Sequence, residues 1–182
     1  MLNKKQSPFA NFSQVQVTTK SSFPRDGRYK VEISNVKKNF SSKPGQIGQM
    51  SIILTLNILD AIVHYDQYTT PEGKVFSSNA PGERVAVHIK WSWGESAFKL
   101  YKQFLMAAAQ MPPSQADTID DSGWEEFCEK ACYNLGDDVE NFDATNWEPQ
   151  PLRGSHIILQ CETVLTQKSK KDFTKVQFEM CD

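Results

Sequence analysis

The stretch "HIKWSWGESAFKLYKQFLMAAAQMPP", residues 88–113, changes its apolar period in the middle and thereby decides the fold. From residue 85 to residue 93 apolar and polar side chains alternate, which is the pattern of a half-buried strand. After Gly94 the apolar side chains recur every three or four residues, as along an amphipathic helix, and the two prolines at 112–113 cannot continue helical hydrogen bonding. The sequence therefore predicts a strand, a tight corner and a helix in direct succession.

The corner carries its own signal for a helix start. Residues 92–95, SWGE, fit a capping box, in which the serine oxygen accepts from an orphan amide and the glutamate side chain reaches back to the cap. Trp91 and Trp93 share the parity of the apolar positions of the strand, so we expect both indoles to pack in the core unless a bulge intervenes. The apolar stripe of the helix comprises Phe98, Tyr101, Leu105 and Ala108, with Phe104 beside it.

Four further segments have the pattern of strands. They cover residues 29–40, 49–59, 155–166 and 173–180. The first of them slips phase at Asn35-Val36, which predicts a bulge in a long, bent strand. With the strand and helix described above, the predicted order is three strands, a helix and two more strands.

This order is typical of the OB barrel, whose helix lies between strands three and four. We therefore expect a mainly β protein with helices (α+β), built as a five-stranded OB-type Greek-key barrel. A chain of 182 residues with 39% hydrophobic side chains suits one domain, which we assign to residues 28–182. Residues 1–27 precede it as an arm or an edge strand.

A long acidic insertion, residues 112–152, separates the helix from the fourth strand. A second capping box at residues 122–125, SGWE, predicts a second helix that ends at Gly136. Residues 114–149 contain eleven acidic side chains and one lysine, a net charge of −10, whereas the rest of the chain has nineteen basic and eleven acidic side chains, +8. A basic body joined to an acidic segment indicates a polyanion-binding surface beside a regulatory or partner-binding element, or else an unevenly charged surface.

No apolar run in the sequence has the form of a signal peptide or a membrane span, because the most apolar segment, residues 50–63, is interrupted by polar side chains. The four cysteines are sparse, which favours reduced thiols over a disulfide framework. We expect a cytoplasmic protein without a membrane partner.

Four segments resemble phage-encoded single-stranded DNA-binding proteins of OB type. They are "GRYKVEISNVKK" (27–38), "SIILTLNILDA" (51–61), "FKLYKQFLMAAAQM" (98–111) and "LRGSHIILQCETVLTQKSKKDFTKVQFE" (152–179). The resemblance implies a non-catalytic protein without a cofactor that coats and protects single-stranded DNA in phage replication or recombination, in the host cell cytoplasm. Two departures are the acidic insertion and the ending "FEMCD", which is not the acidic tail of many single-strand-binding proteins.

Single-strand binding requires cations that follow phosphates and flat aromatic faces on which bases stack. In an OB barrel these lie on the outer face of strands two and three and on the loops after strands one and four. The candidate cations there are Lys37, Lys38, Lys43, His88, Lys90, Lys168, Lys170 and Lys171, and the candidate stacking residues are Phe40, Tyr65, Tyr68, Phe76 and Phe173. For each lysine a solvated side chain, and for each aromatic residue packing at a barrel end, remains the alternative.

Two site chemistries are disfavoured by their local context. Asp60 or Asp66 followed by Glu72-Gly73-Lys74 has the order of a metal-dependent nuclease, but Pro71 and Gly73 predict a turn where such a site needs a strand. Cys128 and Cys132 lie one helical turn apart without a second pair of metal ligands, so buried reduced thiols are favoured over zinc. We therefore expect no enzyme and no metal.

The alternative function is an OB-type protein-interaction module or a DNA mimic that uses the acidic insertion. Replication or recombination proteins are the candidate partners of that insertion, and a homo-oligomer is left open.

Overall fold

The computed structural model describes residues 22–132, 151–167 and 169–181. Its strands are β1 (Gly27–Phe40), β2 (Met50–Val63), β3 (Tyr68–Thr69), β4 (Val75–Phe76), β5 (Arg84–Lys90), β6 (His156–Leu165) and β7 (Asp172–Met180). Its helices are the 3₁₀ turn η2 (Trp91–Trp93), α1 (Glu95–Ala108), α2 (Pro113–Ala116) and α3 (Asp121–Ala131). None of the helices in this described part is long and apolar enough to span a membrane.

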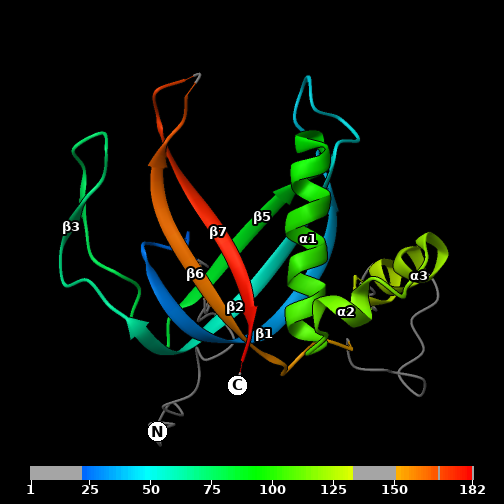
Figure 1. The fold of residues 1–182 in the computed structure, drawn as a ribbon. Helices are drawn as coiled ribbons and strands as arrows, with labels where there is room; N and C mark the ends of the chain where they lie inside the picture. The colour runs from blue at the N-terminus through cyan, green and yellow to red at the C-terminus, as the bar shows by residue number, and fades with distance from the viewer. Residues whose placement is uncertain (1–21, 133–150, 168, 182) are drawn as a thin grey trace, which may run out of the picture.

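The five long strands form one antiparallel sheet in the order β5-β2-β1-β6-β7, and β3 and β4 form a separate hairpin. Figure 1 shows the strands twisting strongly, with α1 standing beside them. The predicted α+β class and the five predicted strands are confirmed. The expected barrel closure is not seen in the hydrogen-bonded pairing of the described strands, in which β5 and β7 are the two sheet edges.

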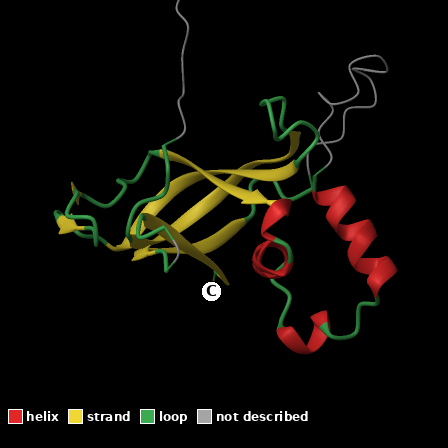
Figure 2. Cartoon of the chain, turned by 90° about the horizontal axis from the view of Figure 1, so that it is seen from above, coloured by secondary structure: helices red, strands yellow, loops and turns green. Residues whose placement is uncertain are grey.

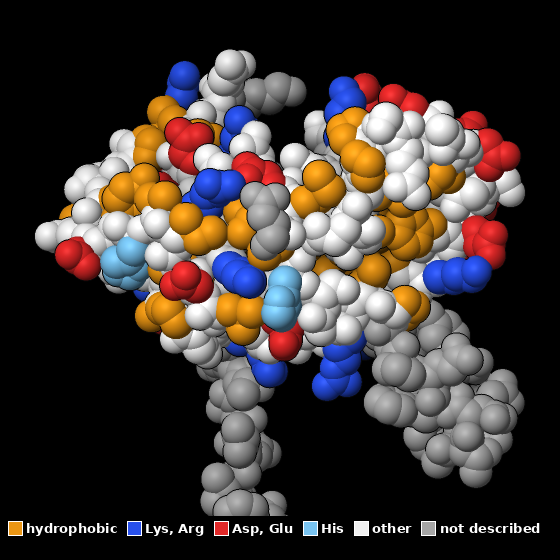
Figure 3. Space-filling view, turned by 60° about the horizontal axis from the view of Figure 1, so that its bottom comes forward, with side chains coloured by type: hydrophobic (Ala, Val, Ile, Leu, Met, Phe, Trp, Pro, Cys, Tyr) orange, Lys and Arg blue, Asp and Glu red, His pale blue; other side chains and the backbone are white. Residues whose placement is uncertain are grey.

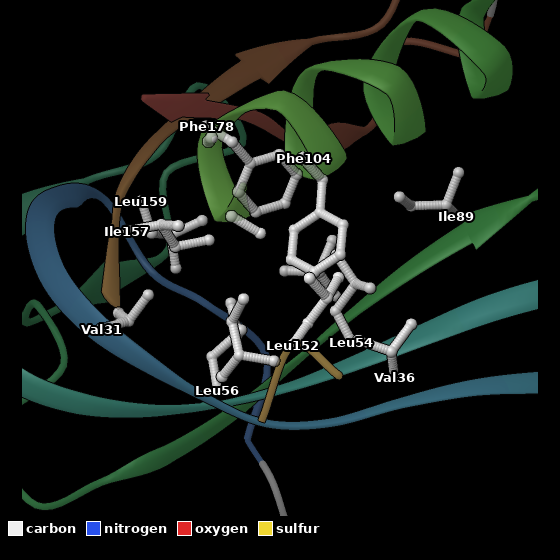
Figure 4. Close-up of a cluster of buried hydrophobic side chains, with 14 of the residues drawn as sticks. Val31, Val36, Leu54, Leu56, Ile89, Phe104, Leu152, Ile157, Leu159 and Phe178 are labelled. Carbon is white, nitrogen blue, oxygen red and sulfur yellow. The ribbon is translucent and has the colours of Figure 1, made fainter. Parts of the chain in front are cut away.

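The core lies between the sheet and α1. Alternate side chains of the strands point into it, and Phe104 of α1 meets Phe178 of β7 edge to face, with ring centroids 5.3 Å apart. Figure 4 shows side chains from all five strands and from α1 directed toward one another. Because each strand buries one face here, the opposite face of the sheet is fixed as the solvent side.

The bulge expected near Asn35-Val36 is confirmed. The register of β1 against β2 shifts between Ile33 and Asn35, so the buried set passes from Ile33 to Val36 without leaving the core. The shift keeps Asn35, Lys37 and Asn39 on the outer face beyond the bulge.

The corner after β5 differs from the prediction. Residues 91–93 form a 3₁₀ turn that interrupts the strand alternation, and Gly94, at φ +60°, is the N-cap of α1 without a side-chain cap bond, so the expected capping box is wrong. Trp91 still packs against the core beside Tyr101, but Trp93 is 39% exposed and does not face inward. The positive φ at Gly94 turns the chain within one residue. Strand parity cannot predict the direction of a side chain at such a corner.

The second helix starts earlier than the capping box at 122–125 predicts. Asp120 is its N-cap and accepts a hydrogen bond from the Gly123 amide. The predicted end at Gly136 lies outside the described residues. Figure 2 shows α2 and α3 to one side of α1. Side-chain contacts join α1 to α3 and its C-cap residue. Tyr101 Oη lies 2.8 Å from Cys132 Sγ, and Lys102 Nζ lies 4.6 Å from the centroid of the Trp124 ring.

The edge of β5 is paired with the chain just before β1. The Ser22 amide donates to the Arg84 carbonyl and the Ala86 amide donates to the Ser22 carbonyl, each at 2.9 Å, which makes a parallel bridge between Ser22 and Val85. Of the segment assigned as an arm or edge strand, residues 1–21 lie outside the described part.

Candidate nucleic-acid interface

The outer face of β1, β2 and β5 carries two rows of side chains set by the strand register. One row is Lys37, Ile53 and His88, and the next is Asn39, Ser51 and Lys90. Lys37, His88 and Lys90 are exposed, whereas Val36, Val87 and Ile89 beside them in the strands point into the core. The structure thus brings together cations from two strands that are far apart in the sequence.

Phe23 extends this face beyond the edge of β5. Its ring is stacked on the imidazole of His88, with centroids 6.0 Å apart and planes 28° from parallel, and it is 73% exposed. Sequence reasoning missed Phe23 as a site residue, although an aromatic residue in a polar segment is a signal that the sequence offers. An exposed ring beside exposed cations is a suitable stacking platform for a base.

His88 is biased toward its neutral form. Partial desolvation of the imidazole, and secondly the nearby Lys90 ammonium, lower the pKa of His88 from its ordinary value. At neutral pH the row therefore presents a neutral ring between Phe23 and the charged lysines.

A hydrogen-bonded polar row limits the cationic area. Arg84 Nε donates to Asn57 Oδ1 (3.1 Å), and Asn57 Nδ2 donates to Glu32 Oε1 (3.2 Å). On the other side of Glu32, His156 Nε2 lies 4.0 Å from its carboxylate. Because Glu32 would repel phosphate, the cationic area lies on the part of β1 beyond it.

The loop after β1 contributes fewer cations than predicted. Lys43 and Phe40 are exposed, and Phe40 is 60% exposed. Lys38, however, donates to both carboxylate oxygens of Glu129 in α3, at 2.9 and 2.7 Å. The acidic helix therefore already neutralises one cation of the predicted site.

The loop between β6 and β7 lies at the same end of the molecule as the loop after β1 (Figure 1). Lys170 and Lys171 are exposed there, and Lys168 lies outside the described residues. Phe173 is 43% exposed and packs edge to face on Trp93, with centroids 6.2 Å apart. Part of the Phe173 ring thus serves packing between β7 and the corner.

The remaining aromatic candidates form a separate group on the β3–β4 hairpin. The Tyr68 ring lies 6.2 Å from those of both Tyr65 and Phe76. Tyr65 is 46% and Phe76 41% exposed. These three residues lie outside the two outer-face rows, so the predicted site is divided into two areas.

The residues considered for metal binding do not form a metal site in the described part of the chain, where no cluster of three or more His, Cys, Asp or Glu side chains is arranged around a common point. Residues 71–73 form the predicted turn. Beside it Lys74 Nζ pairs with the Glu72 carboxylate at 2.6 Å. This ion pair lowers the pKa of Glu72 and raises the pKa of Lys74. Burial raises the pKa of Cys128 to about 11, so this thiol stays protonated at neutral pH.

Acidic side chains gather on the helical side of the molecule. Figure 3 shows them on the right of the face that it presents, over α2 and α3, whereas basic, acidic and apolar side chains are mixed over the sheet.

Comparison of the chain with models of known protein families finds no match, and comparison with functionally curated proteins finds none either.

Proposed function

We propose that this chain is a non-enzymatic single-stranded DNA-binding protein that coats and protects DNA in phage replication or recombination. The observation that carries the proposal is the pair of outer-face rows, in which the register aligns Lys37 with His88 and sets Lys90 one row further. Exposed cations at strand spacing beside an exposed ring provide the two contacts that single-strand binding needs, phosphate neutralisation and base stacking.

We further propose that the sheet is of OB type. Five antiparallel strands, with α1 between the third (β5) and the fourth (β6) of them in chain order, support this assignment. In that fold the face of the second and third strands, here β2 and β5, and the loops after the first and fourth strands bind oligonucleotides. In this proposal the β2 and β5 members of the two rows and the loops with Lys43, Lys170 and Lys171 correspond to those places, and Lys37 lies beside them on β1.

Fluorescence titration tests the proposal directly. Oligo-dT, duplex DNA and RNA are added to the full chain at two salt concentrations, and tryptophan and tyrosine emission is followed. We expect quenching by the single strand and weaker binding at higher salt, because phosphate neutralisation releases counterions. Absence of binding to oligo-dT at low salt would refute the proposal.

The cationic rows have their own test. The double variant Lys37→Ala/Lys90→Ala should flatten the plot of log affinity against log salt by about 0.7 for each phosphate that the variant no longer neutralises. The matched control is Lys99→Ala/Lys130→Ala, whose lysines pair with Glu95 and Glu126 on the helices. Equal slopes for the two double variants would remove the rows from the binding site.

The alternative, an interaction module or DNA mimic, is favoured by one observation. Six acidic side chains between residues 117 and 129 are exposed, namely Asp117, Asp120, Asp121, Glu125, Glu126 and Glu129. A carboxylate-rich helix suits a basic protein partner in replication or recombination. If oligo-dT does not bind, pull-down with such a basic partner becomes the next experiment.

A further inference from the structure

A cavity of about 300 Å³ lies where three segments distant in the sequence meet. Its walls come from residues 22–25, from the β3–β4 hairpin, and from β6 and β7 near their connecting loop. The residues with recognition chemistry are Phe23, Arg25, Tyr68, Lys74, Phe76 and Asp172. The volume is at the lower end of the range of small-molecule sites, which suits a ligand of one nucleotide rather than a larger one.

Hydrogen bonds hold the hairpin wall in place. Thr70 Oγ1 donates to Asp172 Oδ2 (2.6 Å) and the Glu72 amide donates to Asp172 Oδ1 (3.0 Å), so the hairpin is attached to β7. The Asp26 amide donates to Tyr68 Oη (3.1 Å), which attaches the segment before β1 to the same hairpin. Walls fixed in this way lose less conformational entropy when a ligand binds.

The wall chemistry matches a nucleotide. Phe23 and Phe76 are 73% and 41% exposed, so each offers ring surface to a base. Arg25 Nη1 donates to the Ser77 carbonyl at 3.5 Å, and the guanidinium has further N–H donors suited to a phosphate. Lys74 is paired with Glu72, so Arg25 is the better phosphate ligand of the two.

Phe23 also connects the cavity to the outer face. Its ring stacks on His88 of the row described above, and the residue is one of those that line the cavity. A strand that passes from the rows over the edge of β5 toward the hairpin would therefore cross Phe23.

We propose that this cavity holds one nucleotide of the bound single strand, with its base against Phe23 and Phe76 and its phosphate at Arg25. The inference rests on the proposed function and extends it to a subsite away from the outer-face rows. A free mononucleotide has the same chemistry, so the experiment includes it as a separate ligand.

Affinity for oligo-dT and for dTMP is measured on the wild type, Phe76→Leu and Arg25→Gln. The matched controls are Phe98→Leu, an exposed phenylalanine on α1, and Arg153→Gln, an exposed arginine in the turn before β6. We expect Phe76→Leu to weaken oligo-dT binding about tenfold and Arg25→Gln to flatten the salt dependence by about 0.7, with both controls unchanged. As a readout that does not depend on affinity, Phe76→Trp should show emission quenched by oligo-dT.

The outcomes separate this inference from the proposed function. If the wild type binds oligo-dT but the cavity variants match their controls and the Phe76→Trp emission is unchanged, the cavity assignment is wrong and the function stands. If the wild type does not bind oligo-dT, the function fails first. Binding of dTMP alone, abolished in Phe76→Leu, would make the cavity a site for free nucleotides and would overturn the strand-bound assignment.

Discussion

At the scale of single residues, His88 joins three features of the candidate interface. It lies in register with Lys37, it supports the ring of Phe23, and its pKa is lowered by desolvation first and by Lys90 second. Because the pKa of His88 is lowered in the folded state, protonation of His88 destabilises the folded chain relative to the unfolded chain.

This sets the sign of a pH effect. As the pH falls below about 6.5, the unfolded chain binds a proton at His88 before the folded chain does, so the free energy of unfolding decreases. His88→Gln should therefore lose less stability than the wild type between pH 7.5 and pH 5.5. Urea unfolding of both proteins at both pH values measures the difference, and an identical pH dependence would contradict it.

Lys38 shows why single residues of the site were hard to predict. Its place at the end of β1 and its charge were readable from the sequence, but its partner, Glu129, lies 91 residues away. Phe23 was missed for a similar reason. It belongs to the candidate interface because its ring contacts His88, which lies 65 positions later in the sequence. Pattern arguments place a residue on a face and do not show what else reaches that face.

At the scale of elements, α3 is the part that changes the electrostatics of the site. It docks through Trp124, Phe127 and Ala131, and it directs Glu129 at Lys38. The helix therefore places a carboxylate beside one cation of the predicted site, on the face of β1 that is opposite the outer-face rows.

Glu129→Gln should release Lys38 and tighten oligo-dT binding about two- to fivefold at low salt, since an exposed ion pair contributes up to about 1 kcal/mol. Glu126→Gln on the same helix is the control, because Glu126 pairs with Lys130 at 2.6 Å instead. Equal affinities of the two variants would mean that α3 does not compete with phosphate.

The long elements were predictable and the short ones were not. Alternation over Tyr29, Val31 and Ile33 defined β1, and the phase slip located its bulge, because a buried face constrains every second residue. The β3–β4 hairpin pairs only two residues in each strand, too few for a period to be visible. Such an element is held by hydrogen bonds to β7 instead.

At the scale of the whole molecule, the protection of the β5 edge is the feature with the clearest consequence. The two backbone hydrogen bonds of Ser22 cover part of an edge that would otherwise offer unpaired amides and carbonyls to another chain.

Ser22→Pro removes the amide donor to Arg84 and should lower the free energy of unfolding by about 1 kcal/mol. It should also promote concentration-dependent association through the uncovered edge. Ser22→Ala keeps the amide and is the control. Sedimentation velocity at several protein concentrations measures this association. If the sedimentation coefficient of Ser22→Pro does not rise with concentration more than that of Ser22→Ala, the bridge does not protect the edge.

The general location of the candidate site followed from the predicted strand order, since that order defines which face and which loops are exposed. The cavity could not be predicted from the sequence, because it forms where residues 22–25, the β3–β4 hairpin and β7 come together. The hydrophobic periodicity of a single segment contains no information about such long-range contacts. His88 and Lys90 were predictable from strand parity and Lys37 from its place beside the first loop, whereas Arg25 was not.

The central place of β1 has a consequence for synthesis of the chain. β1 pairs with β2 soon after it emerges from the ribosome, but its other edge pairs with β6, which begins about 120 residues later. At translation speeds of about 5–20 residues per second, that edge waits for roughly 6–25 seconds. During this interval a half-made sheet presents its middle strand to neighbouring nascent chains, so the greatest hazard of misassembly comes before the protein is complete.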